Sequence, residues 1–130
     1  MIYLDANVII RLMEGSNSIR RPLEARLNQY RGIQSSLHTS VLSLIECRCK
    51  AYEWNDQLLL QSYDKFFSSY EVRLLDIHPD IVQLATLLRA DGHRTPDAIH
   101  LASSISSGAQ VFLTGDKKLG RFTGVHVEIL

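Results

Sequence analysis

Residues 1–10, "MIYLDANVII", place one aspartate inside a segment that otherwise has the composition of a buried strand running into a buried helix. Apolar residues precede Asp5 directly and return shortly after it. A carboxylate in such surroundings is unfavourable unless it is paired or bound to a metal ion. The segment therefore predicts either a buried partner for Asp5 or a functional site around it.

Strand patterns and helix patterns alternate along the rest of the chain. The helix ends carry the expected signals, with Ser40 and Thr95 as N-caps and with Gly32, Gly92 and Gly108 at C-terminal ends. The predicted strands are residues 2–5, a short strand within 33–40, 71–77, 110–116 and 125–130, and the predicted helices are residues 6–12, 18–31, 41–54, 57–70, 78–92 and 96–108. This alternation predicts an α/β sandwich with a mainly parallel sheet, in which residues 1–130 form a single domain.

Length and composition are those of an ordinary globular domain. The chain has 130 residues, of which 45% are hydrophobic and 22% charged, so it is long enough to bury a sizeable core. Its 14 basic and 14 acidic residues give a net charge of zero. That balance argues against a strongly basic nucleic-acid-binding protein but leaves room for a local basic rim around an acidic pocket.

The sequence carries no pattern that predicts export or membrane insertion. No apolar run approaches the length of about 20 residues needed to span a bilayer, and the start lacks the basic and apolar regions of a signal peptide. Cys47 and Cys49 would point to different faces of a helix, without a nearby histidine pair to complete a zinc site. We therefore expect a cytoplasmic protein without a disulfide or zinc.

Four acidic residues stand out by their positions. Asp5 and Asp116 end predicted strands and Asp97 begins a predicted helix, positions that share the ligand-binding edge of a parallel α/β sheet. Glu46 lies within an otherwise apolar helical stretch. Each also has a structural interpretation. Asp97 can interact with the helix macrodipole, and Asp116 can begin a turn. Glu46 can pair with Lys50 one turn later.

Convergence of these acids would require a cation. Two carboxylates about 4 Å apart repel by roughly 4 kcal/mol at an effective dielectric constant near 20, which is more than an exposed ion pair returns. A set of oxygen ligands without histidine or cysteine selects a hard ion, Mg²⁺ or Mn²⁺. Such an ion serves phosphate chemistry, because it activates water and neutralises charge on phosphoryl oxygens. Spacing alone does not establish that the acids converge.

Four motifs along the chain surround these acids. They are "YLDANVII" at 3–10, "SLIECR" at 43–48, "TPDAIHLASSISSGA" at 95–109 and "FLTGDKKL" at 112–119. In their order and spacing they resemble the motifs of the PIN-domain family, in particular those of the VapC-like toxin ribonucleases of bacterial toxin–antitoxin pairs. The resemblance covers essentially the whole chain, apart from residues 50–70, where no family signature is found. It implies a three-layer α/β/α sandwich with a mainly parallel central sheet.

The resemblance also implies a Mg²⁺-dependent endoribonuclease, with Mn²⁺ as a possible substitute, that leaves a 5′ phosphate and a 3′ hydroxyl. The catalytic and metal-binding residues would be Asp5, Glu46, Asp97 and Asp116. Asp5 and Asp97 would be the central ligands, and the other two would hold a second metal ion or orient water. Asn7 and Thr114 match supporting positions beside the first and last acids. Whether one metal ion or two act stays open.

The expected partners are an RNA substrate and a cognate antitoxin, and the chain is expected to form a homodimer. Apolar side chains for the antitoxin groove or the dimer interface would come from Leu58, Leu59, Tyr63 and Phe66, about half of which are expected in the core instead. Basic residues near the motifs can hold phosphates or remain solvated, namely Arg11, Arg94, Lys117, Lys118 and Arg121. His100, one helical turn after Asp97, is expected to be partly exposed and without a catalytic role.

Three other functions remain in competition. A haloacid-dehalogenase-like phosphatase would share "LDANVI" and "GDKK", but Asn7 stands where its second acid would be, and no further aspartate follows Asp116. A receiver domain would require adjacent acids after the first strand, which "YLDANV" lacks. A noncatalytic RNA-binding or protein-binding module of the same fold would be favoured by the loss of one acid, but all four are present.

Overall fold

The computed structural model describes residues 1–69 and 71–130. Its strands are β1 (Ile2–Leu4), β2 (Leu37–Ser40), β3 (Val72–Leu75), β4 (Val111–Thr114) and β5 (Val127–Ile129). Its helices are α1 (Ala6–Glu14), α2 (Asn17–Gly32), α3 (Leu42–Glu53), α4 (Gln57–Ser68), α5 (Pro79–Ala90) and α6 (Thr95–Ser106), followed by a short 3₁₀ helix, η1 (Lys117–Arg121). None of the helices in these described ranges is long and apolar enough to cross a membrane.

The strands form one five-stranded sheet in the order β3-β2-β1-β4-β5. Every pairing is parallel, including that of the last strand with β4, so the predicted parallel sheet is confirmed. The chain builds outward from β1 to β3 on one side and then crosses to β4 and β5 on the other. The strand order therefore reverses between β1 and β4, and it is at such a switch point, beyond the carboxyl ends of the strands, that α/β sheets bind ligands.

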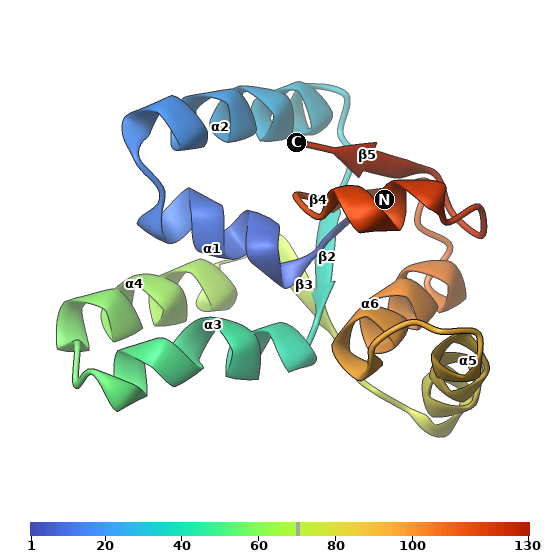
Figure 1. The fold of residues 1–130 in the computed structure, drawn as a ribbon. Coiled ribbons are helices and arrows are strands. Elements are labelled where there is room, and N and C mark those ends of the chain that lie inside the picture. Colours follow the sequence, from blue (N-terminus) through green and yellow to red (C-terminus); the bar gives the residue numbers. More distant parts are fainter. Residues whose placement is uncertain (70) are drawn as a thin grey trace.

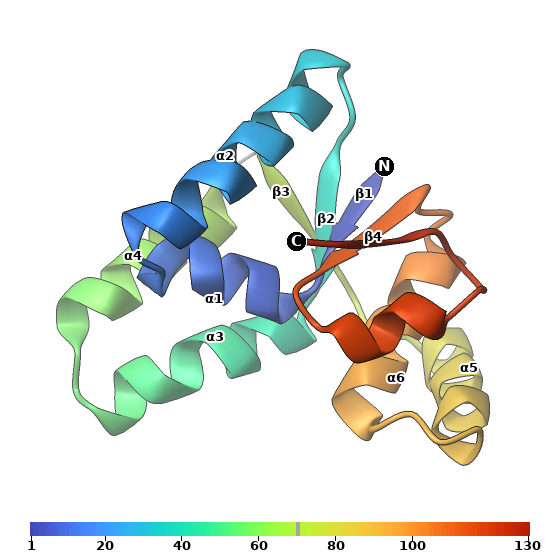
Figure 2. The same ribbon diagram turned by 45° about the horizontal axis from the view of Figure 1, so that its top comes forward.

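The sheet separates two helical layers. Figures 1 and 2 show α1, α2 and α4 on one side of it and α5 and α6 on the other. Alternation along β1 explains both cores: Ile2 and Leu4 pack into the first layer, whereas Tyr3 points into the second. The Tyr3 ring stacks on Phe112 of β4, with the ring centroids 5.4 Å apart. The predicted three-layer α/β/α sandwich is confirmed.

Two predicted N-caps lie one residue away from the observed ones. Ser40 remains in β2, paired with β3, and the N-cap of α3 is Val41. The Ser40 hydroxyl still accepts a hydrogen bond from the backbone N–H of Leu42 at 3.1 Å. Thr95 is already helical, and the N-cap of α6 is Arg94, whose side chain makes no capping hydrogen bond. Both predictions of the capping residue are therefore wrong by one position.

The C-terminal ends of the helices agree better with the glycine pattern. Gly92 and Gly108 follow α5 and α6 with φ angles of +110° and +75°, which glycine adopts without steric penalty. Gly32 is the last residue of α2. The helix predicted over 57–70 ends at Ser68 as α4, and Tyr70 lies outside the described residues.

The apolar residues of α4 divide between the core and the surface. Tyr63 is fully buried, and Leu59 and Phe66 pack against the same core. The prediction that Tyr63 contributes to a partner surface is therefore wrong, because its ring packs in the core. Leu58 is 77% exposed. Helices α3 and α4 follow one another closely and form the α3–α4 hairpin. Its other exposed large apolar side chains are Ile45, Tyr52 and Trp54.

Candidate active site

Asp5 lies at the switch point of the sheet. Its backbone N–H donates to the carbonyl of Leu113 at 3.0 Å, which extends the β1–β4 pairing by one residue before α1 begins. The residue is only 5% exposed. Its Oδ2 accepts hydrogen bonds from the Thr114 hydroxyl at 2.7 Å and from the Asn7 amide at 3.1 Å. The Asp5 carboxylate is therefore fixed in orientation by two neutral donors.

Asn7 and Thr114 connect the ends of β1 and β4 around this carboxylate. The Asn7 amide also donates to Thr114 Oγ1 at 3.2 Å, and its Oδ1 accepts from the backbone N–H of Gly115 at 2.9 Å. Thr114 Oγ1 accepts in turn from the N–H of Asp116 at 3.1 Å. Asn7 and Thr114 therefore lie beside Asp5, and Thr114 also contacts the backbone of Asp116; their supporting role stays a prediction.

The electrostatics of Asp5 place two more of the predicted acids nearby. Burial raises the pKa of the Asp5 carboxyl, and repulsion from Asp97 and Glu46 raises it further. The electrostatic interaction with His100 and the hydrogen bond from Thr114 oppose this rise in the Asp5 pKa without cancelling it. The Asp5, Glu46 and Asp97 carboxylates are therefore close enough to repel one another. This repulsion and the burial of Asp5 make ionisation of its carboxyl less favourable than in water.

Glu46 is linked to Asp5 by His100, which the sequence predicts to be partly exposed and without a catalytic role. His100 Nε2 lies 2.5 Å from Glu46 Oε1 and 3.8 Å from Asp5 Oδ1, and the His100 side chain is 1% exposed. The prediction of a partly exposed His100 is wrong, because the face of α6 that carries it packs against Tyr3 of β1. The structural alternative for Glu46, an ion pair with Lys50, does not form among the described residues, because Lys50 pairs with Glu14.

Lys50 forms its ion pair with a residue of another helix instead of with Glu46. Its ammonium group lies 2.8 Å from Glu14 Oε1 at the end of α1, and it also sits over the Trp54 ring, 4.4 Å from the centroid. The Tyr63 hydroxyl bonds to the same Glu14 carboxylate. These contacts join α1, α3 and α4, so the local i,i+4 partner of Glu46 serves the packing of the helices instead.

Asp97 and Asp116 line the outer part of the site. Both border a pocket of about 330 Å³, together with Gly92, His93, Arg94, Lys118 and Leu119. Arg94 Nε lies 3.7 Å from Asp97 Oδ2. Asp116 Oδ1 accepts from the backbone N–H of Lys118 at 3.0 Å, so the structural role in a turn is also present at this acid. Two acidic side chains, Asp97 and Asp116, and two basic ones, Arg94 and Lys118, therefore border one pocket.

The predicted basic residues divide into two groups. Arg11 donates to the carbonyl of Leu130 at 3.0 Å and packs tightly over Gly115, where a Cβ atom would lie 2.3 Å from its guanidinium. Arg11 is thus part of the scaffold behind the site. The others have exposed side chains around the pocket or on η1, namely Arg94, Lys117, Lys118 and Arg121.

The donor chemistry of this edge fits a hard divalent cation. Asp5, Glu46 and Asp97 supply carboxylate oxygens, and burial raises the pKa of the neighbouring Cys47 thiol to about 12, so Cys47 offers no thiolate. Within residues 1–69 and 71–130, no group of three or more His, Cys, Asp and Glu side chains is arranged to hold a metal ion. Mg²⁺ usually keeps several water ligands and takes one or two protein carboxylates. The carboxylates of this edge are thus ligands of the type that a hard cation takes, and the described residues do not form a closed cage around one.

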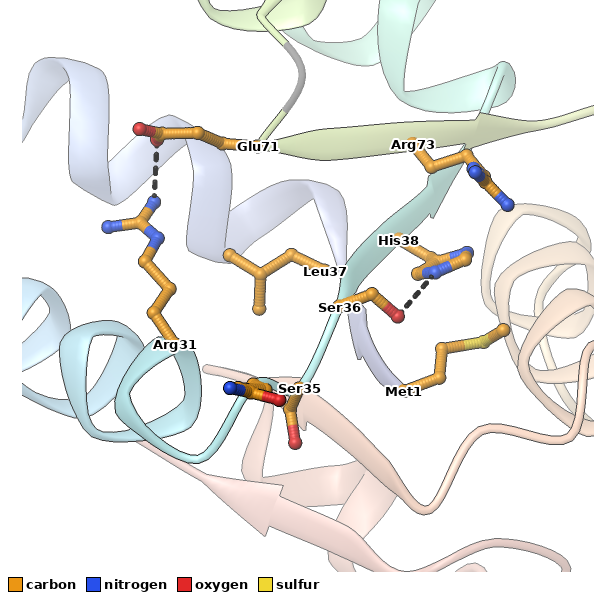
Figure 3. Close-up of a pocket in the computed structure, with 9 residues that line it drawn as sticks. Met1, Arg31, Ser35, Ser36, Leu37, His38, Glu71 and Arg73 are labelled. Carbon is orange, nitrogen blue, oxygen red and sulfur yellow. Dashed lines mark hydrogen bonds and ion pairs between the residues drawn. The ribbon is translucent and has the colours of Figure 1, made fainter.

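A larger pocket, of about 520 Å³, lies at the opposite end of the sheet. Figure 3 shows its lining at the amino ends of the strands, with Arg31 paired to Glu71 and the His38 ring bonded to the Ser36 hydroxyl. None of the four predicted acids borders it. Size alone would thus have pointed away from the acidic edge, and the switch-point geometry identifies the candidate active site better.

Solved structures share this fold over almost their whole length. VapBC2 from Rickettsia felis, bound to a DNA fragment from its promoter, has a TM-score of 0.77 at 18% identity and covers 100% of this chain and 99% of that chain. A toxin–antitoxin complex from Klebsiella pneumoniae has a TM-score of 0.73 at 22% identity, with 96% and 95% covered. VapC20 from Mycobacterium tuberculosis, a Sarcin-Ricin loop cleaving toxin, has a TM-score of 0.73 at 16% identity, with 97% and 99% covered.

Sequence comparison assigns the family. Comparison with curated protein sequences gave no significant match. The family model of the PIN domain, in contrast, matches residues 2–125, which include all four acidic motifs. The chain therefore belongs to the PIN domain family.

Proposed function

We propose that this PIN domain is a Mg²⁺-dependent endoribonuclease of the cytoplasm, with Mn²⁺ as a possible substitute. The observation that carries the proposal is the buried Asp5 carboxylate at the β1–β4 switch point, which is made unfavourable by burial and by repulsion from Asp97 and Glu46. A divalent cation would remove that repulsion. RNA is the proposed substrate because one protein of the same fold is described as cleaving the Sarcin-Ricin loop.

Each acidic residue has a proposed role that follows from its position in the site. Asp5 and Asp97 would hold the cation, while Glu46 and Asp116 would hold a second one or orient water. Bound Mg²⁺ would supply activation of water and neutralisation of charge on the phosphoryl oxygens. The hydrogen bonds from Asn7 and Thr114 keep the Asp5 carboxylate in one orientation.

Arg94 and Lys118 border the same pocket as Asp97 and Asp116. Phosphate contacts from such cations position a nucleic acid without reading its sequence. We therefore assign Arg94 and Lys118 to the phosphates that flank the cut.

Chelation tests the proposed chemistry directly. Purified chain should cleave RNA in Mg²⁺, lose that activity in excess EDTA, and regain it when Mg²⁺ or Mn²⁺ is restored, because carboxylate oxygens are ligands for hard cations. Sequencing of the product ends should find a 5′ phosphate and a 3′ hydroxyl. Cleavage that survives exhaustive chelation, or that leaves a 2′,3′-cyclic phosphate, would contradict the proposal.

We also propose that the chain is the toxin of a toxin–antitoxin pair and forms a homodimer. Structures of this fold include complexes described as toxin–antitoxin assemblies. The antitoxin is assigned here to the exposed apolar side chains of the α3–α4 hairpin, which are Ile45, Tyr52, Trp54 and Leu58. Exposed apolar side chains that gather on one face mark interaction surfaces, and all four of these belong to α3, to α4 or to the turn between them. Sedimentation of the chain alone would measure the proposed dimer.

Leu58→Lys tests this surface. Leu58 is 77% exposed, so the change should leave the fold and RNA cleavage unaltered while it weakens antitoxin binding by about tenfold or more, through loss of about 1.4 kcal/mol or more of contact energy. Ile33, which is 73% exposed beyond the end of α2, offers the matched control Ile33→Lys. Equal antitoxin affinity of Leu58→Lys and wild type in a calorimetric titration would remove the hairpin from the interface.

A further inference from the structure

We infer that His100, held by Tyr3, is a positioning residue that fixes the Glu46 carboxylate beside Asp5 for the cation. The inference rests on the proposed function, since it concerns the same site. It starts from two distances, 2.7 Å from Tyr3 Oη to His100 Nδ1 and 2.5 Å from His100 Nε2 to Glu46 Oε1. These contacts form one chain from β1 through α6 to α3.

The acceptor at Glu46 sets the direction of the bonds in this chain. An ionised carboxylate can only accept, so a neutral ring carries its hydrogen on Nε2 and donates it to Glu46, which leaves Nδ1 as an acceptor. The Tyr3 hydroxyl accepts from the backbone N–H of Ser40 at 3.0 Å and has its own hydrogen to donate to Nδ1. This tautomer satisfies the partners on both sides of the ring, as in histidines that support metal sites.

The ring is held rigidly in this position. His100 is 1% exposed, and the Tyr3 ring meets it edge to face, with centroids 5.8 Å apart. Tyr3 is itself fixed by stacking on Phe112 and by its bond to Ser40. Because Tyr3 and His100 are both buried, the hydrogen that His100 donates to Glu46 has one direction, and α3 is tied to the strand that ends before Asp5.

The placement also reduces the repulsion between the two carboxylates. His100 Nε2 lies 3.8 Å from Asp5 Oδ1, too far for a hydrogen bond but close enough for its N–H dipole to act. The described hydrogen bond of the Glu46 side chain engages Oε1, and those of the Asp5 side chain engage Oδ2. The other oxygen of each acid, Glu46 Oε2 and Asp5 Oδ1, is left to face a cation or its water.

A merely structural buried histidine would behave differently. Its loss would lower stability but would leave the cation affinity of the folded protein unchanged. A positioning residue affects that affinity, and the loss of groups that orient metal ligands commonly weakens metal binding by about 10–100-fold. The affinity for Mn²⁺, measured on the folded protein, therefore separates the two roles without reference to cleavage.

Two substitutions at His100 form a matched pair. In His100→Gln the amide nitrogen takes the place of Nε2 and can still donate to Glu46, whereas in His100→Asn the amide replaces Nδ1 and does not reach Glu46. Calorimetric titration with Mn²⁺ should show about 10–100-fold weaker binding for His100→Asn and an affinity within a few-fold of wild type for His100→Gln. In a Glu46→Gln background the effect of His100→Asn should largely disappear.

Wild-type affinity in folded His100→Asn would overturn the inference while the proposed function stands. Failure of the wild-type chain to bind Mn²⁺ and to cleave RNA would instead overturn the proposed function, and the inference with it. Nitrogen NMR of wild-type His100 decides even if His100→Asn does not fold: a hydrogen on Nε2 and none on Nδ1 supports the inference, and any other protonation pattern overturns it.

Discussion

Asp5→Asn is expected to reduce RNA cleavage by more than about 100-fold, the upper end of what outer-shell partners of a metal site contribute. The amide is nearly the same size as the carboxylate and can still accept hydrogen bonds from Thr114 and Asn7. The fold should therefore survive. What is lost is the negative charge that would hold a cation at the end of β1. Initial rates of cleavage of a labelled RNA, measured in Mg²⁺, would give the ratio.

The same substitution is expected to stabilise the protein when no cation is present. Because the pKa of Asp5 is raised in the folded state, the unfolded chain releases its proton at lower pH than the folded one does. The contribution of Asp5 to the unfolding free energy therefore falls as pH rises from the unfolded pKa to the folded pKa. Asp5→Asn lacks this loss, so its Tm in EDTA at pH 7 should be higher, by roughly 4 °C for each kcal/mol of relief.

Asp64→Asn is the matched control for both measurements. Asp64 is an exposed residue of α4 whose side chain lies 3.3 Å from Arg48, so its neutralisation should change cleavage and Tm little. Undiminished cleavage by folded Asp5→Asn would contradict the catalytic assignment. A lower Tm in EDTA would contradict the electrostatic account, because it would mean that the Asp5 charge stabilises the metal-free fold.

The fold was predictable because its signals are local and repeated. Apolar runs and helical spacing recur along the chain, and the parallel order follows from their alternation. Asp5 was also predictable, since a single carboxylate within an apolar segment is informative on its own. The cap predicted at Ser40 was displaced because the end of β2 depends on its pairing with β3, which the sequence does not specify. At α6 the helix begins one residue before the predicted start, with Thr95 already helical.

The contacts between helices were beyond local reasoning. Glu46 has Lys50 one turn later, and nothing in the sequence shows that Glu14 of α1 takes that lysine instead. His100 follows Asp97 at a helical spacing, but its burial depends on which face of α6 meets the sheet. The alternation of side chains along β1 explains this burial. Ile2 and Leu4 point into one helical layer and Tyr3 into the other, so the hydroxyl of Tyr3 requires a polar partner on α6. That signal becomes readable only once the layers are known.

Expression of the wild-type chain alone in bacteria is expected to arrest growth and to lower the number of colony-forming cells by orders of magnitude. The pocket that holds Asp97 and Asp116 is open to substrate, and Arg94 at its border has a side chain that is 83% exposed. An accessible site of this kind would act on cellular RNA continuously. Asp97→Asn, expressed to the same level, is the control and should permit normal growth.

Co-expression of the open reading frame beside the gene should relieve the arrest, and its product should copurify with the chain. A segment that presents an Arg or Lys to the carboxylates would occupy the place of the cation, because a charge-assisted bond can replace metal coordination in neutralising them. Relief would then disappear for an antitoxin variant without that basic side chain. Normal growth at confirmed expression of the folded wild-type chain, with no neighbour that copurifies, would overturn the toxin proposal. The nuclease proposal would then depend on the chelation experiment alone, because an RNA-cleaving PIN domain with a narrow target need not harm its host.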